Sequence, residues 1–293
     1  MTENKERKYS LIEKLLFPSV RVNASKLTKA LVDKTIVITG ASYGIGESLT
    51  LQLASTGAYL ILVARTKDKL EALKAEVASR GGKAVVFAAD LRNEKEIDSF
   101  IQFLLHQNKI DYFINNAGKS IRRSLLASLD RYHDFARTMA INYEAPVKLA
   151  LSLLPKLSQS QGHIINISSL SVLMAPAPYW AAYQASKTAF DQWFRCAMPE
   201  IHTMQVHTTS IYLPLVKTRM ISPTKIYDRM PAMNPEHVAR IICHCMLTKR
   251  QVCKPWWSFL GELASVVFSK TSRRVLSCRL RTIQKSKGRF LLL

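Results

Sequence analysis

The stretch that decides the fold reads TIVITGASYGIG and runs from Thr35 to Gly46. Its first five residues form a Val/Ile-rich run typical of a buried strand. The remainder places Gly40, Gly44 and Gly46 between that strand and the start of a helix. In this position glycines let the backbone approach a pyrophosphate, and the first-turn N–H groups and the helix dipole favour negative charge. Glycines alone would equally suit a tight turn without a ligand, so the surrounding sequence has to decide.

Outward from this stretch, short apolar runs alternate with longer amphipathic segments, which is the pattern of βα units around a parallel sheet. Strands are expected at Thr35–Thr39, Ala58–Ala64, Ala84–Ala88, Asp111–Asn115, His163–Ser168 and Val206–Tyr212. Helices are expected at Glu47–Ser55, Lys67–Ser79 and Glu94–His106, with Gly81 and Gly82 placed to end the second. With right-handed crossovers, this order predicts an α/β fold with a Rossmann-type, doubly wound parallel sheet covered by helices on both faces.

Length and composition favour one domain with extensions at both ends. The chain has 293 residues, of which 48% are hydrophobic and 22% charged, enough for one large α/β core. We expect an amphipathic, basic N-terminal extension over residues 1–33 and a nucleotide-binding domain over 34–250. A basic apolar extension over 251–293 follows, where the α/β alternation stops.

Positive charge is concentrated at the C-terminal end. The formal net charge is +21, and residues 249–293 hold eleven Lys or Arg against the single acid Glu262. Such a tail could contact nucleic acid, anionic lipid or an acidic substrate, or it could only be a solvated surface. It lacks a recognisable nucleic-acid-binding motif with interleaved stacking aromatics, so no nucleic-acid partner is expected.

The cysteines and the apolar runs indicate in which cellular compartment the protein is expected. The five cysteines are odd in number and have no CxxC spacing, so neither a disulfide framework nor a zinc site is expected. Cys243, His244 and Cys245 are adjacent positions of a helix and point in different directions, so no metal is expected there either. Neither a signal peptide nor a run of about 18 apolar residues occurs. We expect a cytoplasmic protein, with peripheral contact at the inner face of an anionic membrane left open.

The end of the second expected strand indicates which nicotinamide nucleotide would bind. An NAD enzyme usually places an acid there to hydrogen-bond the ribose 2′-hydroxyl, whereas this chain has Ala64 and Arg65. Arg65 offers a planar cation suited to a 2′-phosphate, and the Ser42 hydroxyl is a candidate second donor. NADPH is therefore favoured over NADH. The alternative is that Arg65 is only a surface arginine.

A tyrosine and a lysine lie one helical turn apart in a stretch expected to be helical from Ala181 to Phe194. Tyr183 to Lys187 read YQASK, and residues at i and i+4 share one face of a helix. Because a nearby ammonium favours tyrosinate, we expect Lys187 to lower the pKa of Tyr183 from about 10 toward the working range of a general acid. Lys187 can also hold the ribose of a cofactor.

The fifth expected strand ends in Ser168 and Ser169, at the sheet edge where ligands bind in such folds. Ser169, fourteen residues before Tyr183, is expected to orient a substrate carbonyl. The alternative is a turn hydroxyl without a role, as Ser168 or Ser171 would be. Asn142 lies in a helical stretch, where asparagine is disfavoured and most often exposed.

These motifs together resemble the short-chain dehydrogenase/reductase family. TGASYGIG, the NNAG of Asn115–Gly118, Asn142, Ser169 and YQASK occur in the family's order and spacing across roughly residues 33–250. The resemblance implies a catalytic tetrad of Asn142, Ser169, Tyr183 and Lys187, in which Asn142 supports a proton-relay water. It also implies a homodimer or homotetramer.

The resemblance further implies which residues hold NADPH. Asp90 and Leu91 would line the adenine pocket, and Thr218 would contact the nicotinamide amide. The full implied set is Gly40, Ser42, Tyr43, Gly44, Ile45, Gly46, Arg65, Asp90, Leu91, Asn116, Ala117, Gly118, Tyr183, Lys187, Pro214, Val216 and Thr218.

Two longer stretches narrow the resemblance. FINNAGKSIRRSLLASLDRYHDFARTMAINY, from Phe113, and YLPLVKTRMISPTKIYDRMPAMNPE, from Tyr212, are similar to bacterial long-chain fatty acyl-CoA reductases, which make fatty aldehydes from acyl-CoA. The chain departs from the family at Leu215, where a glycine is usual, and at Arg219, where a proline is expected. These departures leave cofactor use untouched and bear on the substrate.

The segment expected to contact the substrate is compatible with a fatty acyl substrate but does not decide the substrate. Residues 217–233 carry apolar side chains that suit a lipid chain or could be core: Met220, Ile221, Ile226, Tyr227 and Met230. Basic residues near the mouth could meet CoA phosphates. Two alternatives stay open: a reductase of another bulky carbonyl (a fatty aldehyde, a 3-oxo lipid or a steroid-like ketone), and a non-catalytic NADPH-binding protein of the membrane surface.

Overall fold

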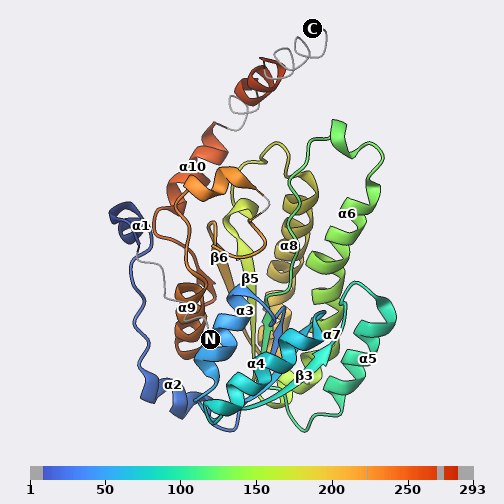
Figure 1. Ribbon diagram of the computed structural model, residues 1–293, viewed down its shortest axis with the longest axis vertical. Coiled ribbons are helices and arrows are strands. Elements are labelled where there is room, and N and C mark those ends of the chain that lie inside the picture. Colours follow the sequence, from blue (N-terminus) through green and yellow to red (C-terminus); the bar gives the residue numbers. More distant parts are fainter. Residues whose placement is uncertain (1–8, 223, 269–273, 283–293) are drawn as a thin grey trace.

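The computed structural model describes residues 9–222, 224–268 and 274–282, and within them seven strands form one parallel sheet (Figure 1). The strand order is β3-β2-β1-β4-β5-β6-β7. The strands are β1 Thr35–Thr39, β2 Tyr59–Ala64, β3 Lys83–Ala88, β4 Tyr112–Asn115, β5 His163–Ser169, β6 His207–Leu213 and β7 Val252–Cys253. The order reverses beside β1, whose neighbours are β2 and β4. A crevice opens at such a reversal, at the carboxyl edge of the sheet, and ligands bind in it.

Helices cover both faces, which confirms the predicted doubly wound architecture. Helices α2, α3, α4 and α9 pack on one face through side chains such as Leu31 and Leu49. Helices α5, α7 and α8 pack on the other through Phe100 and Phe190. The α-helices are α1 Leu11–Leu16, α2 Ala24–Leu31, α3 Gly44–Leu53, α4 Lys67–Ser79, α5 Glu94–Leu105, α6 Tyr132–Met139, α7 Ala145–Gln159, α8 Ala181–Thr203, α9 Pro235–Thr248 and α10 Ser258–Val267. Short turns of other helix types are η1 Leu126–Ser128, η2 Ala140–Glu144, η3 Leu170–Val172 and η4 Lys225–Arg229.

The sequence prediction missed one strand, shortened one helix and displaced another: α3, expected at Glu47–Ser55, begins at Gly44 and ends at Leu53. β7 has only two residues and follows the polar pair Arg250 and Gln251, so no apolar run marks it; it forms by pairing Val252 with Ser210 of β6. α8 was expected to end at Phe194 and continues to Thr203, through Pro199. The other expected strands agree with the structure to within one residue at each end.

The described N-terminal segment packs on the body, and the residues directly before α10 contact that segment. Phe17, Leu27 and Leu31 are buried in the core formed with α3 and α9. From the other end, the indole N–H groups of Trp256 and Trp257 donate to the carbonyls of Leu15 and Leu16, at 3.2 and 3.1 Å. The predicted terminal extensions also include residues 1–8, 269–273 and 283–293, which lie outside the described residues. Over the described part of the chain, no helix combines the length and the apolar composition needed to cross a membrane.

Candidate active site

The glycine turn after β1 is fastened to the NNAG segment by Thr39. The Thr39 hydroxyl donates to the Ile114 carbonyl at 3.2 Å and accepts from the backbone N–H groups of Asn116 and Ala117, each at 3.0 Å. The Asn116 side chain donates in turn to the carbonyls of Thr39 and Gly40, at 2.9 and 3.2 Å. These hydrogen bonds therefore join the two loops, the turn Thr39–Gly46 and the segment Asn115–Gly118, into one rigid unit. We call it the nucleotide floor. Thr39 was not predicted as a site residue, although a buried hydroxyl at the end of a strand that opens on such a turn was the available signal.

The glycines of this floor occupy positions where a side chain would collide with neighbouring atoms. A Cβ on Gly46 would lie 2.4 Å from the Gly40 carbonyl oxygen, and one on Gly44, where φ is +59°, would lie 2.9 Å from the Thr218 methyl group. A Cβ on Gly118 would lie 3.5 Å from the Lys187 ammonium. The structure thus brings the predicted turn, Thr218 and Lys187 around one cradle, and α3 begins at Gly44 with its N–H groups there. This shape fits a pyrophosphate of a dinucleotide.

The residues predicted for the adenine end lie beside this turn. Backbone hydrogen bonds from Gly40 and Ala41 to the Val63 carbonyl hold the turn against the end of β2, directly before Arg65, whose side chain is exposed. Asp90 follows β3 and pairs with Arg92. That hydrogen-bonded pair, against the effect of burial, holds the pKa of Asp90 below its usual range, and Arg65 lowers it further. Arg65 is therefore close to Asp90 and open to an anionic ligand.

The cofactor roles of the remaining predicted residues stay predictions. Ser42 and Leu91 are nearly buried, and Val216 is fixed by backbone pairing with Met233. Tyr43 lies under the guanidinium of Arg219, 5.0 Å from the ring centre. Arg219, which departs from the family pattern, thus covers the glycine turn from the substrate-side segment.

Ser169 and Tyr183 meet at the carboxyl edge of β5. Ser169 is the last residue of β5, Tyr183 lies in the first turn of α8, and their hydroxyls share a hydrogen bond. The Ser169 oxygen also accepts from the Ser171 hydroxyl at 3.0 Å. Ser168 points to the other side of the strand, where it donates to Asp191 at 3.5 Å. The geometry therefore favours Ser169, as predicted.

The expected effect of Lys187 on Tyr183 is wrong in this structure. Burial raises the pKa of Tyr183, and the hydrogen bond with Ser169 lowers it only in part. Lys187 donates instead to the Ile167 carbonyl at 3.1 Å. Burial also lowers the pKa of Lys187 to about 8, against the attraction of Asp191. Because desolvation dominates at both groups, Tyr183 holds its proton at neutral pH, as a proton donor must.

Asn142 is buried, so the alternative of an exposed asparagine is wrong. It lies in η2, a π-helical turn between α6 and α7, a distortion that is frequent at functional sites. Its side-chain N–H₂ donates to the Lys119 carbonyl and to the Ser186 hydroxyl, and its oxygen accepts from the Lys119 backbone N–H, all at 2.9 Å. Ser186 donates in turn to the Tyr183 carbonyl at 2.8 Å. Asn142 thereby ties the NNAG segment to the YQASK turn, and Lys119 and Ser186 are positioning residues that the sequence analysis missed.

An aromatic series leads from Tyr183 into the predicted substrate segment. The Trp180 ring lies 5.7 Å from that of Tyr183 and 6.0 Å from that of Tyr227, nearly parallel to the latter. Met220 and Met230 are 42% and 46% exposed, so they are not core residues. The side chain of Ile226 lies outside what the structure describes. Trp180 and Tyr227 thus form an aromatic wall beside Tyr183, and Trp180 is a member that sequence reasoning missed.

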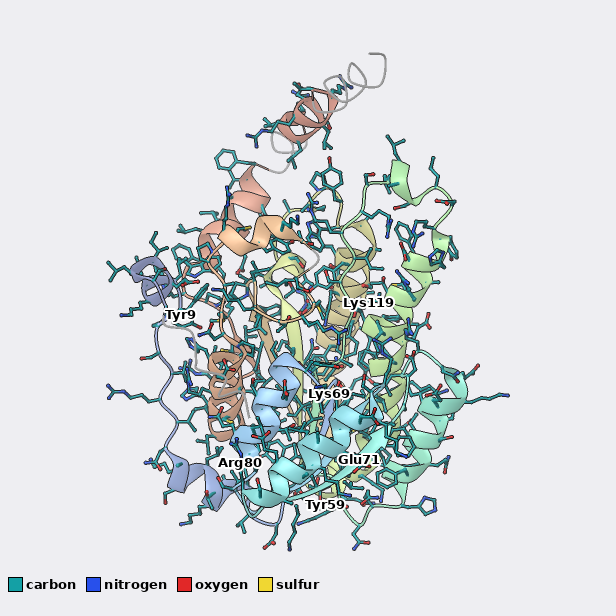
Figure 2. All side chains as sticks on the ribbon, viewed as in Figure 1. Tyr9, Tyr59, Lys69, Glu71, Arg80 and Lys119 are labelled. Atoms are coloured by element: carbon teal, nitrogen blue, oxygen red, sulfur yellow. The ribbon has the colours of Figure 1, made fainter. Side chains whose placement is uncertain are left out.

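Several cations gather on the other side of the same edge. Burial lowers the pKa of Lys119, and the positive charges of Arg137, Arg92 and Arg65 lower it further. Figure 2 shows Lys119 near the centre of the view, above the sheet. An open cavity of about 630 Å³ lies alongside, and Arg92 and Arg137 are among its lining residues. This region is suited to phosphate groups.

A doubly wound sheet with a glycine turn after β1 and a Ser–Tyr–Lys group at its carboxyl edge defines an oxidoreductase that uses a nicotinamide dinucleotide. The sequence model described as "short chain dehydrogenase" matches residues 34–226. The chain belongs to this family.

Relatives agree with this assignment. A fatty acyl-CoA reductase of Acinetobacter baylyi is 44% identical over 238 residues, 80% of this chain and 79% of that protein. A fatty acyl-CoA reductase of Mycobacterium tuberculosis is 42% identical over 71% of this chain and 72% of that protein. Among solved structures, a metagenomic short-chain oxidoreductase in complex with NADP is 28% identical, with a TM-score of 0.66 over 77% of this chain and 99% of that one.

Proposed function

We propose that this protein reduces a hydrophobic carbonyl with NADPH, and that its substrate is a long-chain fatty acyl-CoA, which it converts to a fatty aldehyde. The observation that carries the proposal is the protonated Tyr183, hydrogen-bonded to Ser169, at the foot of the aromatic wall of Trp180 and Tyr227. This arrangement supports Tyr183 as the proton donor to a substrate with a long apolar group. Both relatives named above are fatty acyl-CoA reductases.

NADPH fits the residues present. The cradle that a Cβ would fill at Gly44, Gly46 and Gly118 suits the pyrophosphate, and the exposed Arg65 suits the 2′-phosphate. The NADP complex of the metagenomic relative supports the same nucleotide. When bound, NADPH supplies the hydride.

The chain supplies orientation and the proton. The hydroxyls of Ser169 and Tyr183 hold the carbonyl oxygen, and Tyr183 gives that oxygen a proton as the carbonyl carbon receives the hydride. With a thioester the product is a thiohemiacetal; its carbon–sulfur bond breaks, the hydroxyl proton passes to sulfur, and an aldehyde and free CoA leave. Lys187 would hold the ribose of the bound cofactor, and Asn142 would support a water that returns a proton to Tyr183.

The cations near Lys119 support a CoA ester over a free aldehyde. Burial and the nearby charges of Arg137, Arg92 and Arg65 lower the pKa of Lys119. This holds although Arg92 pairs with Asp90 and Arg137 pairs with Asp134. Phosphates of CoA would relieve this repulsion, whereas an uncharged aldehyde or ketone would not. Reduction of another bulky carbonyl is the alternative. The homo-oligomeric state and the cytoplasmic location stay predictions.

The test is NADPH oxidation measured in parallel with palmitoyl-CoA, a long-chain aldehyde and a panel of ketones. We expect turnover of the acyl-CoA with release of a free thiol, and a loss of about 1,000-fold or more in turnover for Tyr183→Phe with NADPH binding retained. Turnover of the aldehyde or a ketone alone would move the assignment to the alternative carbonyl. Near-wild-type activity of Tyr183→Phe would refute the role of Tyr183, and silence on all substrates would revive the non-catalytic interpretation.

A further inference from the structure

Helix α10 has the reverse of the polarity expected for a helix on the surface of a protein in water. Its inward residues are small or polar: Ser258 is buried, the Ser265 hydroxyl accepts from the Ala175 N–H at 2.8 Å, and a Cβ on Gly261 would lie 2.8 Å from the Met174 side chain. The apolar residues face outward and are more than half exposed: Phe259, Leu260, Leu263, Val266 and Val267. A helix in water places its apolar stripe against the core.

Helix α1 shows the same reversal. Glu13 is 3% exposed, and its carboxylate accepts hydrogen bonds from the Ser10 N–H at 3.0 Å and from the Lys217 ammonium at 3.3 Å. Leu11, Ile12 and Leu15 lie outward, each more than 60% exposed. The acid is thus inside and three of the four apolar side chains of α1 are outside, whereas Leu16 packs against the core.

The two reversed helices belong to one surface. Trp256 and Trp257, directly before α10, donate to the carbonyls at the end of α1, and Trp256 is itself 55% exposed. Figure 1 shows α1 and α10 at the same end of the molecule. We call the exposed apolar side chains of α1 and α10, with Trp256, the α1–α10 surface. Contiguous exposed apolar areas of this kind mark interaction sites.

The positive charge of the C-terminal part of the sequence indicates which partner fits this surface. Residues 249–293 hold eleven Lys or Arg against Glu262, and that acid pairs with Lys254. Three of these eleven cations, Arg274, Arg279 and Arg281, lie in the described helical turns at 274–282, which follow α10 in the chain. A second copy of the chain would bring the same positive charge to the contact and be repelled, whereas anionic phospholipid would be attracted. Apolar side chains bordered by Lys and Arg are the composition of an interfacial membrane contact.

The surface also adjoins the substrate side of the active site. Met174 and Ala175, which α10 contacts, lie between Ser169 and Tyr183, and Gln184 holds the same loop through the Ser171 carbonyl at 2.6 Å. From these observations we infer that the α1–α10 surface docks the enzyme on an anionic bilayer with the substrate mouth at the lipid. Docking as such is independent of the chemistry, and the delivery of an acyl chain rests on the function proposed above.

The test is co-sedimentation of the full chain with vesicles of phosphatidylglycerol and phosphatidylethanolamine, and with phosphatidylcholine vesicles. We expect binding to the anionic vesicles that falls at least tenfold in high salt. The variant Leu260→Ser/Leu263→Ser/Val267→Ser should also bind at least tenfold more weakly. Leu151→Ser, on α7 and 56% exposed like Leu260, is the matched control and should bind as wild type.

Turnover of a short-chain, water-soluble acyl-CoA by the triple variant separates docking from folding and from catalysis, because that substrate needs no membrane. We expect it to be unchanged, and we expect Tyr183→Phe to bind vesicles normally. Absence of wild-type binding, or equal binding by the triple variant, would overturn the proposal. So would a triple variant that becomes monomeric while wild type oligomerises and ignores vesicles, since the surface would then belong to a second copy.

Discussion

The nucleotide side and the substrate side of this protein are built in different ways. The nucleotide floor is made by loops that follow the neighbouring strands β1 and β4, joined by Thr39 and Asn116 through the backbone. The substrate segment after β6 is held instead from a distant part of the chain: Glu13 contacts Lys217 and the Ala232 N–H, and Tyr9 accepts from the Asn234 N–H. In Figure 2, Tyr9 lies beside α1 at the edge of the body. The predicted cofactor site thus rests on hydrogen bonds between two adjacent loops of the sheet edge, and the predicted substrate segment rests on residues near the N-terminus.

The largest effect is expected on the nucleotide side, from Gly46→Ala. The new Cβ would lie 2.4 Å from the Gly40 carbonyl and 2.9 Å from the Asn116 side chain, so the floor itself has to move. We expect NADPH to bind about 100-fold more weakly, equivalent to roughly 3 kcal/mol. The measurement is NADPH affinity by fluorescence titration.

Gly81→Ala is the control for this change. Gly81 also has a positive φ, +77°, but a Cβ there meets nothing within 4 Å. We expect a loss of stability of about 1 kcal/mol with NADPH affinity unchanged. Equal weakening of NADPH binding by both variants would mean that Gly46 acts through stability and not through the cradle.

A smaller effect on the same side is expected from Arg65→Ala. Loss of a charge-assisted contact with the 2′-phosphate should raise the Michaelis constant for NADPH roughly 10- to 100-fold and leave that for NADH nearly unchanged. Arg80→Ala, an exposed arginine of the neighbouring helix cap that pairs with Glu76, should change neither constant. A parallel rise in both constants for Arg65→Ala would remove Arg65 from 2′-phosphate recognition.

The same contrast explains how far the sequence could predict the molecule. The sheet, the glycine turn, Ser169 and the YQASK pair were predictable because each depends on residues close together in the chain or on the rule that ligands bind at the carboxyl edge. The direction of the Tyr183 pKa was not, because it depends on burial in the folded state. The contact of Glu13 with Lys217 joins residues about 200 positions apart, and no periodicity encodes such a pair.

Lys187 on the nucleotide side and Tyr183 on the substrate side should also differ in their response to pH. Burial lowers the pKa of Lys187 to about 8, so this cation loses its proton as the pH rises through 8, while Tyr183 with its raised pKa remains protonated. We expect kcat/KM for NADPH, which reports the free enzyme, to fall by about tenfold per pH unit above this value. In Lys187→Arg the cation persists, so this alkaline limb should move to higher pH even if turnover is low. A limb unmoved in Lys187→Arg would assign it to another group.

The smallest effect on catalysis, and the one that tests the substrate side alone, is expected from Glu13→Gln. Burial tends to raise the pKa of Glu13, but hydrogen bonds from the backbone of Ser10 and Ala232 and from Lys217 hold it at about 2, below the ordinary 4.5. A depressed carboxyl pKa stabilises the fold above about pH 4.5, and this contribution is lost as the pH falls from 4.5 toward 2. We therefore expect the variant to lose on the order of 2 kcal/mol of unfolding free energy at pH 7, measured by urea denaturation, with the difference from wild type shrinking below pH 4.5.

The functional consequence of Glu13→Gln separates the two sides. If Glu13 holds the substrate segment in place, the Michaelis constant for acyl-CoA should rise about two- to fivefold, a free-energy change of ~0.5–1 kcal/mol, while NADPH affinity stays constant. Glu71→Gln, on the exposed face of α4 and labelled in Figure 2, should change neither quantity. A variant whose NADPH affinity falls together with its acyl-CoA affinity would show that the ends of the chain also support the nucleotide floor. The division between a locally built cofactor site and a remotely held substrate segment would then fail.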